Sequence, residues 1–186
     1  MIDETKNPWK TLKSEVKYDN PWIKITESKT INADGGDGIY GVVHYKNIAI
    51  GIIPFDENYN TWIVGQYRYP LNQYSWEICE GGGLLTDDVL DAAKRELKEE
   101  LGIEAKHWTK LLDMHLSNSV SDECGTIYIA KGLSYFDPEP EEGEILQIKK
   151  LPFNEVYDMV MNGEITDSLS VAGILKTKIL IDKGTI

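Results

Sequence analysis

The sequence of 186 residues predicts an α/β fold, in which a mixed β-sheet lies between helices and a small β-rich extension precedes it. Three observations predict this fold. Short apolar or alternating segments separated by turn residues recur through residues 47–80 and predict tandem strands. A glycine cluster at 81–83 then predicts a loop that leads into a helix. Further strand-like segments and two helical segments follow, and this order of elements is typical of a sheet flanked by helices.

The extension is predicted to cover residues 1–46, and the main domain residues 47–186. Alternating polar and β-forming residues predict strands in the extension, with a break at Asn20 and Pro21 and a turn at 34–38. The main domain opens with the continuous apolar segment IAIGIIPF, which is typical of a buried strand. The further strands are expected at 61–69, 74–79, 107–116, 126–133 and 146–153, and the last two helices at 154–161 and 168–181.

The composition excludes several functions. The net charge is −12, from 31 acidic and 19 basic residues, which argues against non-specific binding to nucleic acid or to an anionic membrane. Anionic small-molecule substrates stay open, because a divalent cation can invert the local field. Only two cysteines are present, Cys79 and Cys124, and reduced cysteines in a cytoplasmic protein are expected. The first ten residues lack the apolar segment of a signal peptide, and no apolar segment is long enough to span a bilayer.

Three carboxylates gather near the end of the helix that follows the glycines, at Glu96, Glu99 and Glu100. They lie three and four residues apart, so a helix places them on one face. Like charges at this spacing repel, and a hard divalent cation would remove that repulsion because such cations prefer oxygen ligands. The alternative is a solvated acidic helix. A neighbouring apolar stripe predicts the buried face, at Leu90, Ala93, Leu97 and Leu101.

Residues 95–103 read RELKEELGI and match the pattern REUxEExGU, where U is a bulky aliphatic residue. Gly81 stands where the same pattern has its first glycine. This stretch resembles the signature of the Nudix hydrolases, and the resemblance implies a Nudix α/β/α sandwich with a mixed β-sheet. One position departs from the pattern, because Asp87 stands where the family has glutamate.

A second resemblance covers most of the chain. Residues 64–83, VGQYRYPLNQYSWEICEGGG, are similar to the ADP-ribose and nucleoside diphosphate sugar pyrophosphatases, as are the β-rich extension and the segment NGEITDSLSVAGIL. That subfamily often carries Pro-Ala before the first glycine, where this chain has Cys79 and Glu80, so ADP-ribose and a hexose nucleotide such as GDP-mannose both stay open. The resemblance implies metal-dependent hydrolysis to a nucleoside monophosphate and a sugar phosphate, with Mg2+ or Mn2+.

Two alternatives remain beside this function. One is a Nudix hydrolase of nucleoside triphosphates or dinucleoside polyphosphates. The other is a catalytically silent Nudix fold that binds a nucleotide as a sensor.

The resemblance also implies roles for the residues of the signature. Glu96 and Glu100 are expected to be metal ligands, and Glu99 a ligand, a close support or a catalytic residue. The main-chain carbonyl of Glu80 would complete the metal shell. Arg95 lies four residues before Glu99 and is expected to pair with it and orient its carboxylate.

The resemblance implies that the general base comes from an acidic loop after the signature, and the matching region here is PEPEEGE at 138–144. Glu141, Glu142 and Glu144 are the candidates there, and Glu123 is a further one. The alternative is that these glutamates only solvate the surface.

The remaining candidates are expected to contact substrate. Arg68 is similar to a phosphate-contacting arginine of the family, or is a plain edge-strand arginine, and Glu77 corresponds to a position that helps to hold substrate. Tyr18 and Trp22 could stack on the base of the nucleotide or only pack an interface. In the subfamily the extension often crosses to a partner subunit, which implies a homodimer. His44, alone in a strand, is expected to be structural.

Overall fold

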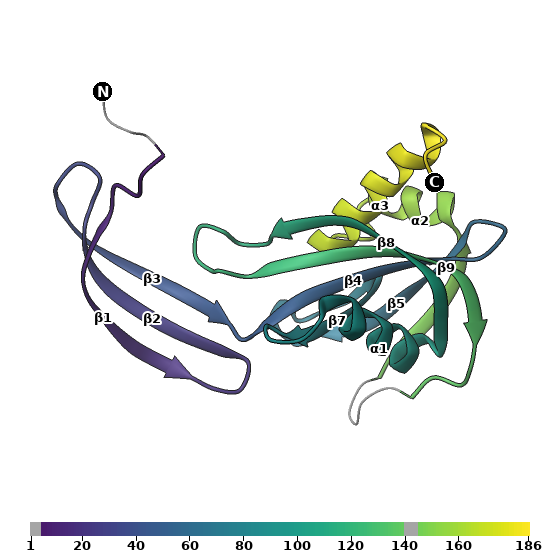
Figure 1. The fold of residues 1–186 in the computed structure, drawn as a ribbon, viewed down its shortest axis with the longest axis horizontal. Coiled ribbons are helices and arrows are strands. Elements are labelled where there is room, and N and C mark those ends of the chain that lie inside the picture. The colour runs from purple at the N-terminus through teal and green to yellow at the C-terminus, as the bar shows by residue number, and fades with distance from the viewer. Residues whose placement is uncertain (1–4, 140–144) are drawn as a thin grey trace. The chain divides into compact units, whose positions relative to one another are not determined.

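The computed structural model describes residues 5–139 and 145–186, and it contains two compact units (Figure 1). The N-terminal unit combines the described part of Met1–Asn47 with the segment Ser117–Glu123. The catalytic unit, so called for the site described below, combines Ile48–Leu116 with Cys124–Ile186. No helix in the described ranges is long and apolar enough to cross a membrane.

The N-terminal unit is an antiparallel sheet of β1 (Lys10–Asp19), β2 (Ile23–Ile31) and β3 (Asp37–Tyr45), in that order. The predicted break after β1 is a tight turn, in which the side chain of Asn20 accepts hydrogen bonds from the backbone amides of Trp22 and Ile23. The turn before β3 lies at 32–36, two residues earlier than expected, because β2 ends at Ile31 and β3 begins at Asp37.

The segment Ser117–Glu123 extends this sheet from a distant part of the chain. The amide of Val43 donates to the carbonyl of Val120 at 2.9 Å. His44 contacts Asp122 through Nδ1 at 2.6 Å and Thr26 through Nε2 at 2.9 Å. Both ring nitrogens of His44 are therefore engaged by protein groups, as expected for a structural histidine.

The catalytic unit contains a mixed four-stranded sheet, whose strands are β4 (Asn47–Phe55), β7 (Cys79–Leu84), β8 (Ile103–His115) and β9 (Cys124–Tyr135). Their order in the sheet is β7-β4-β9-β8. Strands β4 and β9 run parallel, whereas β8 and β9 run antiparallel. A second, antiparallel sheet has the order β10-β5-β6, and it consists of β5 (Asn60–Arg68), β6 (Gln73–Glu77) and β10 (Gln147–Pro152), with the short 3-10 helix η1 (Tyr69–Leu71) between β5 and β6.

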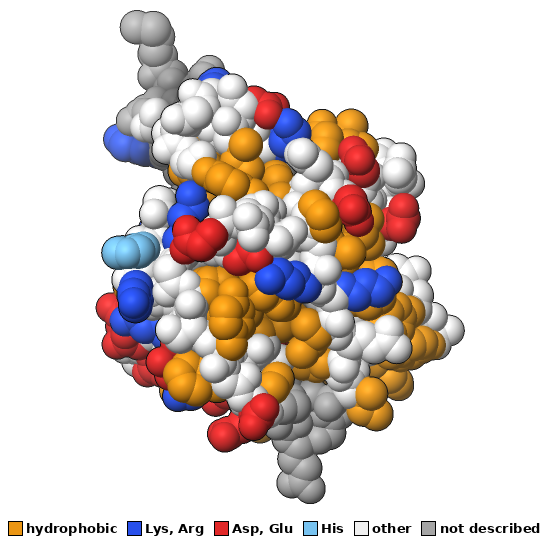
Figure 2. Space-filling view, turned by 90° about the vertical axis from the view of Figure 1, so that its right-hand side faces the viewer, with side chains coloured by type: hydrophobic (Ala, Val, Ile, Leu, Met, Phe, Trp, Pro, Cys, Tyr) orange, Lys and Arg blue, Asp and Glu red, His pale blue; other side chains and the backbone are white. Residues whose placement is uncertain are grey.

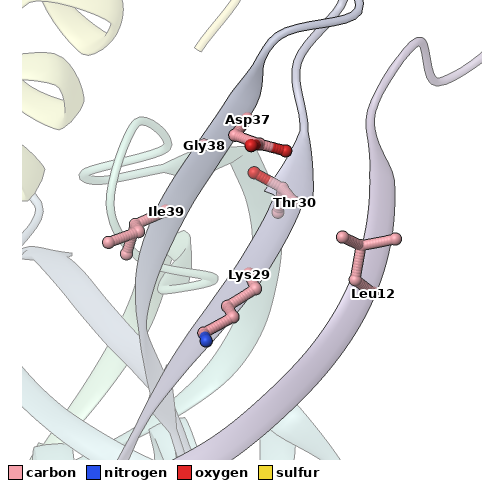
Figure 3. Close-up of a pocket in the computed structure, with 6 residues that line it drawn as sticks. All are labelled: Leu12, Lys29, Thr30, Asp37, Gly38 and Ile39. Atoms are coloured by element: carbon pink, nitrogen blue, oxygen red, sulfur yellow. The ribbon is translucent and has the colours of Figure 1, made fainter.

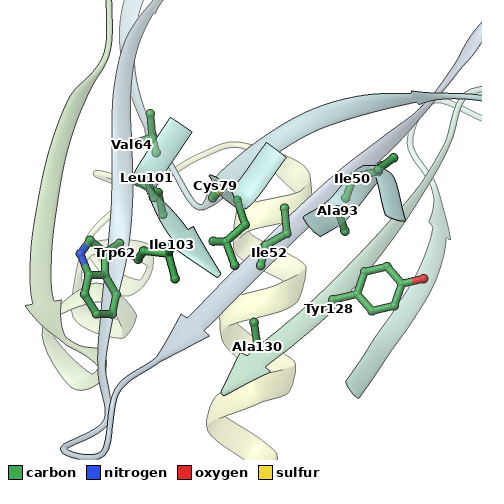
Figure 4. Close-up of a cluster of buried hydrophobic side chains, with 12 residues drawn as sticks. Ile50, Ile52, Trp62, Val64, Cys79, Ala93, Leu101, Ile103, Tyr128 and Ala130 are labelled. Carbon is green, nitrogen blue, oxygen red and sulfur yellow. The ribbon is translucent and has the colours of Figure 1, made fainter. Parts of the chain in front are cut away.

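Strand β4 shows why the sheet is covered on both faces. Ile50 and Ile52 point into a cluster that includes the buried side of helix α1 (Val89–Leu101), as the close-up in Figure 4 shows. Ile53 and Phe55 belong to a second cluster, which includes the helices α2 (Phe153–Met161) and α3 (Ser168–Asp182). Because alternate residues of a strand face opposite sides, a strand buried on both sides needs a continuous apolar segment. The predicted α/β/α sandwich is confirmed.

The glycine cluster is not the loop that the sequence predicted. Residues 81–83 lie within strand β7, and the turn comes later, between β7 and α1. A Cβ atom at Gly83 would lie 2.9 Å from Cβ of Ala92 on α1. The glycines therefore serve close packing of the helix on the strand, which is a requirement of the tertiary structure that no local pattern reveals.

Candidate active site

Helix α1 has defined signals at both ends. The side chain of Asp88 accepts hydrogen bonds from the amides of Leu90 and Asp91, and so caps the first turn. Gly102 ends the helix with φ of +62°, a conformation that glycine adopts without strain. The capping carboxylate is thus Asp88, whereas Asp87, the residue that departs from the family pattern, lies before the helix and accepts from the hydroxyl of Thr86.

Arg95 links the acidic face of α1 to strand β7. Its Nη1 lies 2.6 Å from Oε2 of Glu99, which is the pairing that the sequence predicted. Its Nη2 lies 2.7 Å from Oε1 of Glu96 and donates to the carbonyl of Gly82 at 2.9 Å. The amide of Gly82 donates in turn to Oε1 of Glu96 at 3.2 Å. The guanidinium of Arg95 therefore joins two of the predicted metal ligands to the backbone of strand β7.

Two of the signature carboxylates are largely shielded from solvent. Burial raises the pKa of Glu96, against the lowering effects of Arg95 and of the Gly82 amide. Glu100 is only 4 % exposed and lies beside Cys79. Burial, together with the neighbouring charge of Glu100, raises the pKa of the Cys79 thiol well above its usual value, so this thiol stays protonated and is not a nucleophile.

Gly81 makes room for Glu96. A Cβ atom at position 81 would lie 2.1 Å from Cδ and 2.4 Å from Oε2 of Glu96. No side chain larger than hydrogen fits there unless Glu96 moves, so the first glycine of the signature fixes where this carboxylate can lie.

Gly81→Ala tests this contact. We expect kcat to fall about tenfold, because the new methyl group displaces the carboxylate of Glu96 from β7, a loss of about 1.4 kcal/mol in transition-state stabilisation. The protein should still fold, as measured by circular dichroism. Gly41→Ala is the matched control, because a Cβ atom there meets nothing within 4 Å. An unchanged kcat for Gly81→Ala would contradict this role of the glycine.

The donor groups fit a hard divalent cation in kind, because carboxylate and main-chain carbonyl oxygens are the ligands that Mg2+ and Mn2+ prefer. Within residues 5–139 and 145–186, no three acidic, histidine or cysteine side chains converge closely enough to hold an ion. The guanidinium of Arg95 bridges Glu96 and Glu99, and the side chain of Glu80 turns toward α3. A cation at this site would therefore draw the carboxylates of α1 together, and Glu80 could contribute only its carbonyl without leaving its present contacts.

Arg68 and Glu77 form a bidentate ion pair. Nε of Arg68 donates to both carboxylate oxygens of Glu77, at 3.0 and 3.1 Å, and Nη2 donates to Oε2 at 2.5 Å. Glu77 is only 2 % exposed, whereas Arg68 is partly open to solvent. The sequence assigned both residues to substrate, and the structure brings them together. The signal for their pairing is the antiparallel hairpin of β5 and β6, in which both side chains point to the same face of the sheet.

A buried polar cluster beside this pair escaped the sequence analysis. The hydroxyl of Ser170 donates to Oε1 of Glu80 at 2.7 Å, and Asp167 caps helix α3 by accepting from the amide of Ser170 at 2.9 Å. Burial and the adjacent Asp167 raise the pKa of Glu80 well above its usual value. Although burial alone would raise the pKa of Asp167, its hydrogen bonds with Glu80 and Ser170 lower it. The environment thus favours the neutral form of Glu80 and the charged form of Asp167.

The predicted general bases Glu141, Glu142 and Glu144 lie outside the described residues. The backbone just before them is hydrogen-bonded to helix α1, because the amide of Glu139 donates to the carbonyl of Glu99 at 2.9 Å. Glu139, the last described residue before these glutamates, therefore lies beside the C-terminal turn of α1.

Three other candidates belong to the N-terminal unit. Tyr18 and Trp22 are exposed there, on and after strand β1, and Trp22 is 66 % exposed. Glu123 lies in the segment that packs on β3 and interacts with Tyr45. The roles of these three residues stay predictions.

The sandwich, with strand β7 packed on the acidic helix α1, agrees with the fold that the sequence resemblance implied. Comparison with protein families identifies a NUDIX domain over residues 45–168 and a nucleoside diphosphate sugar hydrolase N-terminal domain over residues 9–43. The chain belongs to the Nudix hydrolase family. It is accordingly an enzyme of a family that generally uses divalent metal ions.

Several characterised proteins are similar over most of their length. An ADP-ribose pyrophosphatase of Mycobacterium tuberculosis is 30% identical over 173 residues, which cover 90% of this chain and 82% of that protein. A GDP-mannose pyrophosphatase of Klebsiella pneumoniae is 26% identical, over 74% of this chain and 69% of that protein. The solved structure of an ADP compounds hydrolase shares the fold, with a TM-score of 0.84 and 20% identity over 96% of this chain and 97% of that chain.

Proposed function

We propose that this protein hydrolyses the diphosphate linkage of a nucleoside diphosphate sugar, ADP-ribose or a hexose nucleotide such as GDP-mannose. The products would be a nucleoside monophosphate and a sugar phosphate. The observation that carries the proposal is that Arg95 joins the acidic face of α1 to the backbone of strand β7. The N-terminal family domain and the relatives that cleave ADP-ribose and GDP-mannose support this class of substrate.

Glu96, Glu100 and the carbonyl of Glu80 would hold Mg2+ or Mn2+, with Glu99 as a further ligand or support. A bound divalent cation neutralises the diphosphate and lowers the pKa of coordinated water. Arg95 keeps the carboxylate of Glu99 oriented through their ion pair.

Arg68 would hold a phosphate of the substrate. Its Nε and Nη2 are committed to Glu77, so Nη1 is the nitrogen that would donate to a phosphate oxygen. The buried carboxylate of Glu77 fixes the guanidinium in one orientation.

Charges of both signs are mixed on the face of the molecule in Figure 2, so the net charge of −12 does not make that face uniformly repulsive to an anion.

A glutamate of the acidic loop, Glu142 or Glu144 with Glu141 as a further candidate, would take the proton of the attacking water. The attachment of Glu139 to the end of α1 supports this assignment, because it starts the loop beside the signature helix.

A panel of substrates tests the function. ADP-ribose, GDP-mannose, ATP and a diadenosine polyphosphate would each be incubated with Mg2+ and with Mn2+, and the products separated by chromatography. We expect a nucleoside monophosphate and a sugar phosphate from a sugar nucleotide. Preferential cleavage of the triphosphate or the dinucleoside polyphosphate would support the first alternative, and nucleotide binding without turnover would support a sensor.

We also propose that the N-terminal unit pairs with a second copy of the chain. Its sheet exposes large apolar side chains on the two outer strands, β1 and β3, among them Ile39, which is 72 % exposed. A groove runs across all three strands, as Figure 3 shows, and its lining residues are Leu12, Lys29, Thr30, Asp37, Gly38 and Ile39. A small sheet that exposes large apolar side chains gains stability when a partner covers them.

Ile39→Glu tests the pairing. Light scattering coupled to size-exclusion chromatography should show a dimer for the wild type and a monomer for the variant, because a charge would be buried in the interface. Ile179→Glu is the control, since Ile179 is also an exposed isoleucine but lies on α3 in the catalytic unit. A monomeric wild type, or an Ile39→Glu variant that stays dimeric, would contradict the proposal.

A further inference from the structure

We propose that Ser170 and Asp167, at the N-terminus of helix α3, are positioning residues for the active site. They hold the start of strand β7, and through Glu80 they tie this strand to Arg68. The inference rests on the proposed function, because it gives a task to residues that touch neither the metal nor the substrate.

Ser170 bridges α3 to the backbone and to a side chain at the start of β7. Its hydroxyl oxygen accepts from the amide of Ile78 at 3.0 Å and donates to Oε1 of Glu80 at 2.7 Å. The residue is 0 % exposed, so water cannot replace either bond. A buried hydroxyl with both its donor and its acceptor capacity used fixes its partners relative to each other.

Asp167 sets the position of Ser170. Its carboxylate accepts from the amide of Ser170 at 2.9 Å and lies close to the carboxyl group of Glu80. Oε2 of Glu80 lies 3.8 Å from Nη2 of Arg68. A continuous polar chain therefore runs from the cap of α3, through Glu80, to the arginine that is proposed to hold phosphate.

The other end of the same short strand is fastened to α1. Gly82 donates its amide to Glu96 and accepts from Arg95 through its carbonyl. Ile78 and Gly82 are four residues apart, or roughly 13 Å along an extended chain. A shift of the strand at the α3 end would therefore move its contacts with the signature carboxylates.

Strand β7 needs such anchors because it is an edge strand. In the order β7-β4-β9-β8, it has a strand neighbour on one side only among the residues that the structure describes. An edge strand is less restrained by its sheet than a central one, since one row of main-chain groups lacks a ladder partner. Side-chain contacts from α1 and α3 supply the restraint that the missing neighbour would give.

Ser170→Ala is the first test, with Asp167→Ala as a second, independent variant. Ser168→Ala is the matched control, because Ser168 is an exposed serine in the same turn of α3. We expect kcat for the best substrate of the panel to fall about 10- to 100-fold in both test variants, while KM changes by less than about threefold. The affinity of the substrate-free protein for Mn2+, measured by electron paramagnetic resonance, should weaken about tenfold. The control should match the wild type in each measurement.

The kinetic constants and the Mn2+ affinity together distinguish a failure of the proposed function from a failure of the positioning role. If the wild type cleaves no nucleotide of the panel, the proposed function is wrong, and the Mn2+ affinities alone decide the positioning role. If the test variants melt at lower temperature but keep the wild-type Mn2+ affinity and kcat, the cluster only stabilises the fold and the positioning role is refuted. Should Ser170→Ala not fold, Asp167→Ala decides on the same criteria, because it leaves the serine in place.

Discussion

Glu100→Gln is expected to lower kcat by about two orders of magnitude or more while the fold is kept, the scale of losing one key electrostatic element of an active site. Glu100 lies four residues after Glu96, so the two carboxylates would bind the same cation from one helix face. Glutamine has the size of glutamate but no charge. The substitution also removes a charge from a side chain that is 4 % exposed, so the folded state should not be weakened.

The measurement is kcat at saturating Mg2+, together with thermal melting followed by circular dichroism. Glu155→Gln is the control, because Glu155 is exposed in the first turn of α2 and far in sequence from the signature. Near-normal turnover of Glu100→Gln at saturating metal would remove Glu100 from the set of metal ligands. A large loss of stability would instead show that its carboxylate is needed for folding.

The sequence predicted the parts of this fold that depend on local patterns. The apolar segment of β4 and the helical spacing in α1 both reflect burial, which repeats along a single element. The pairing of Arg95 with Glu99 was predictable for the same reason, because it joins residues one helical turn apart.

The parts that were not predicted depend on contacts between distant segments. Ser170 meets Glu80 across 90 positions, and Tyr40 meets Ser119 across 79. Serine in the first turn of a helix has a sufficient local explanation, so nothing in the pattern around it pointed to β7. The glycines at 81–83 were assigned to a loop for a similar reason, because the packing of α1 on the strand is visible only in three dimensions.

Arg68→Ala is expected to have two separable effects. Activity should fall about 10- to 100-fold, mainly through a higher KM, because a charge-assisted contact with a substrate phosphate is lost. The free energy of unfolding should also fall, by about 2–4 kcal/mol, because Glu77 would remain buried without its cation; this is below the usual cost of breaking a fully buried pair, since the arginine is partly solvated. Kinetics and chemical denaturation measure the two effects.

The double variant Arg68→Met with Glu77→Gln separates the effects. Methionine and glutamine replace the ion pair by groups of similar length without a buried charge, and such replacements are often neutral for stability. We therefore expect the double variant to recover most of the unfolding free energy lost in Arg68→Ala, while KM stays high. If KM also returned to the wild-type value, Arg68 would serve only to neutralise Glu77, and the phosphate would be held elsewhere. If both stability and KM were unchanged in Arg68→Ala itself, the bidentate pair would contribute neither to the fold nor to substrate binding.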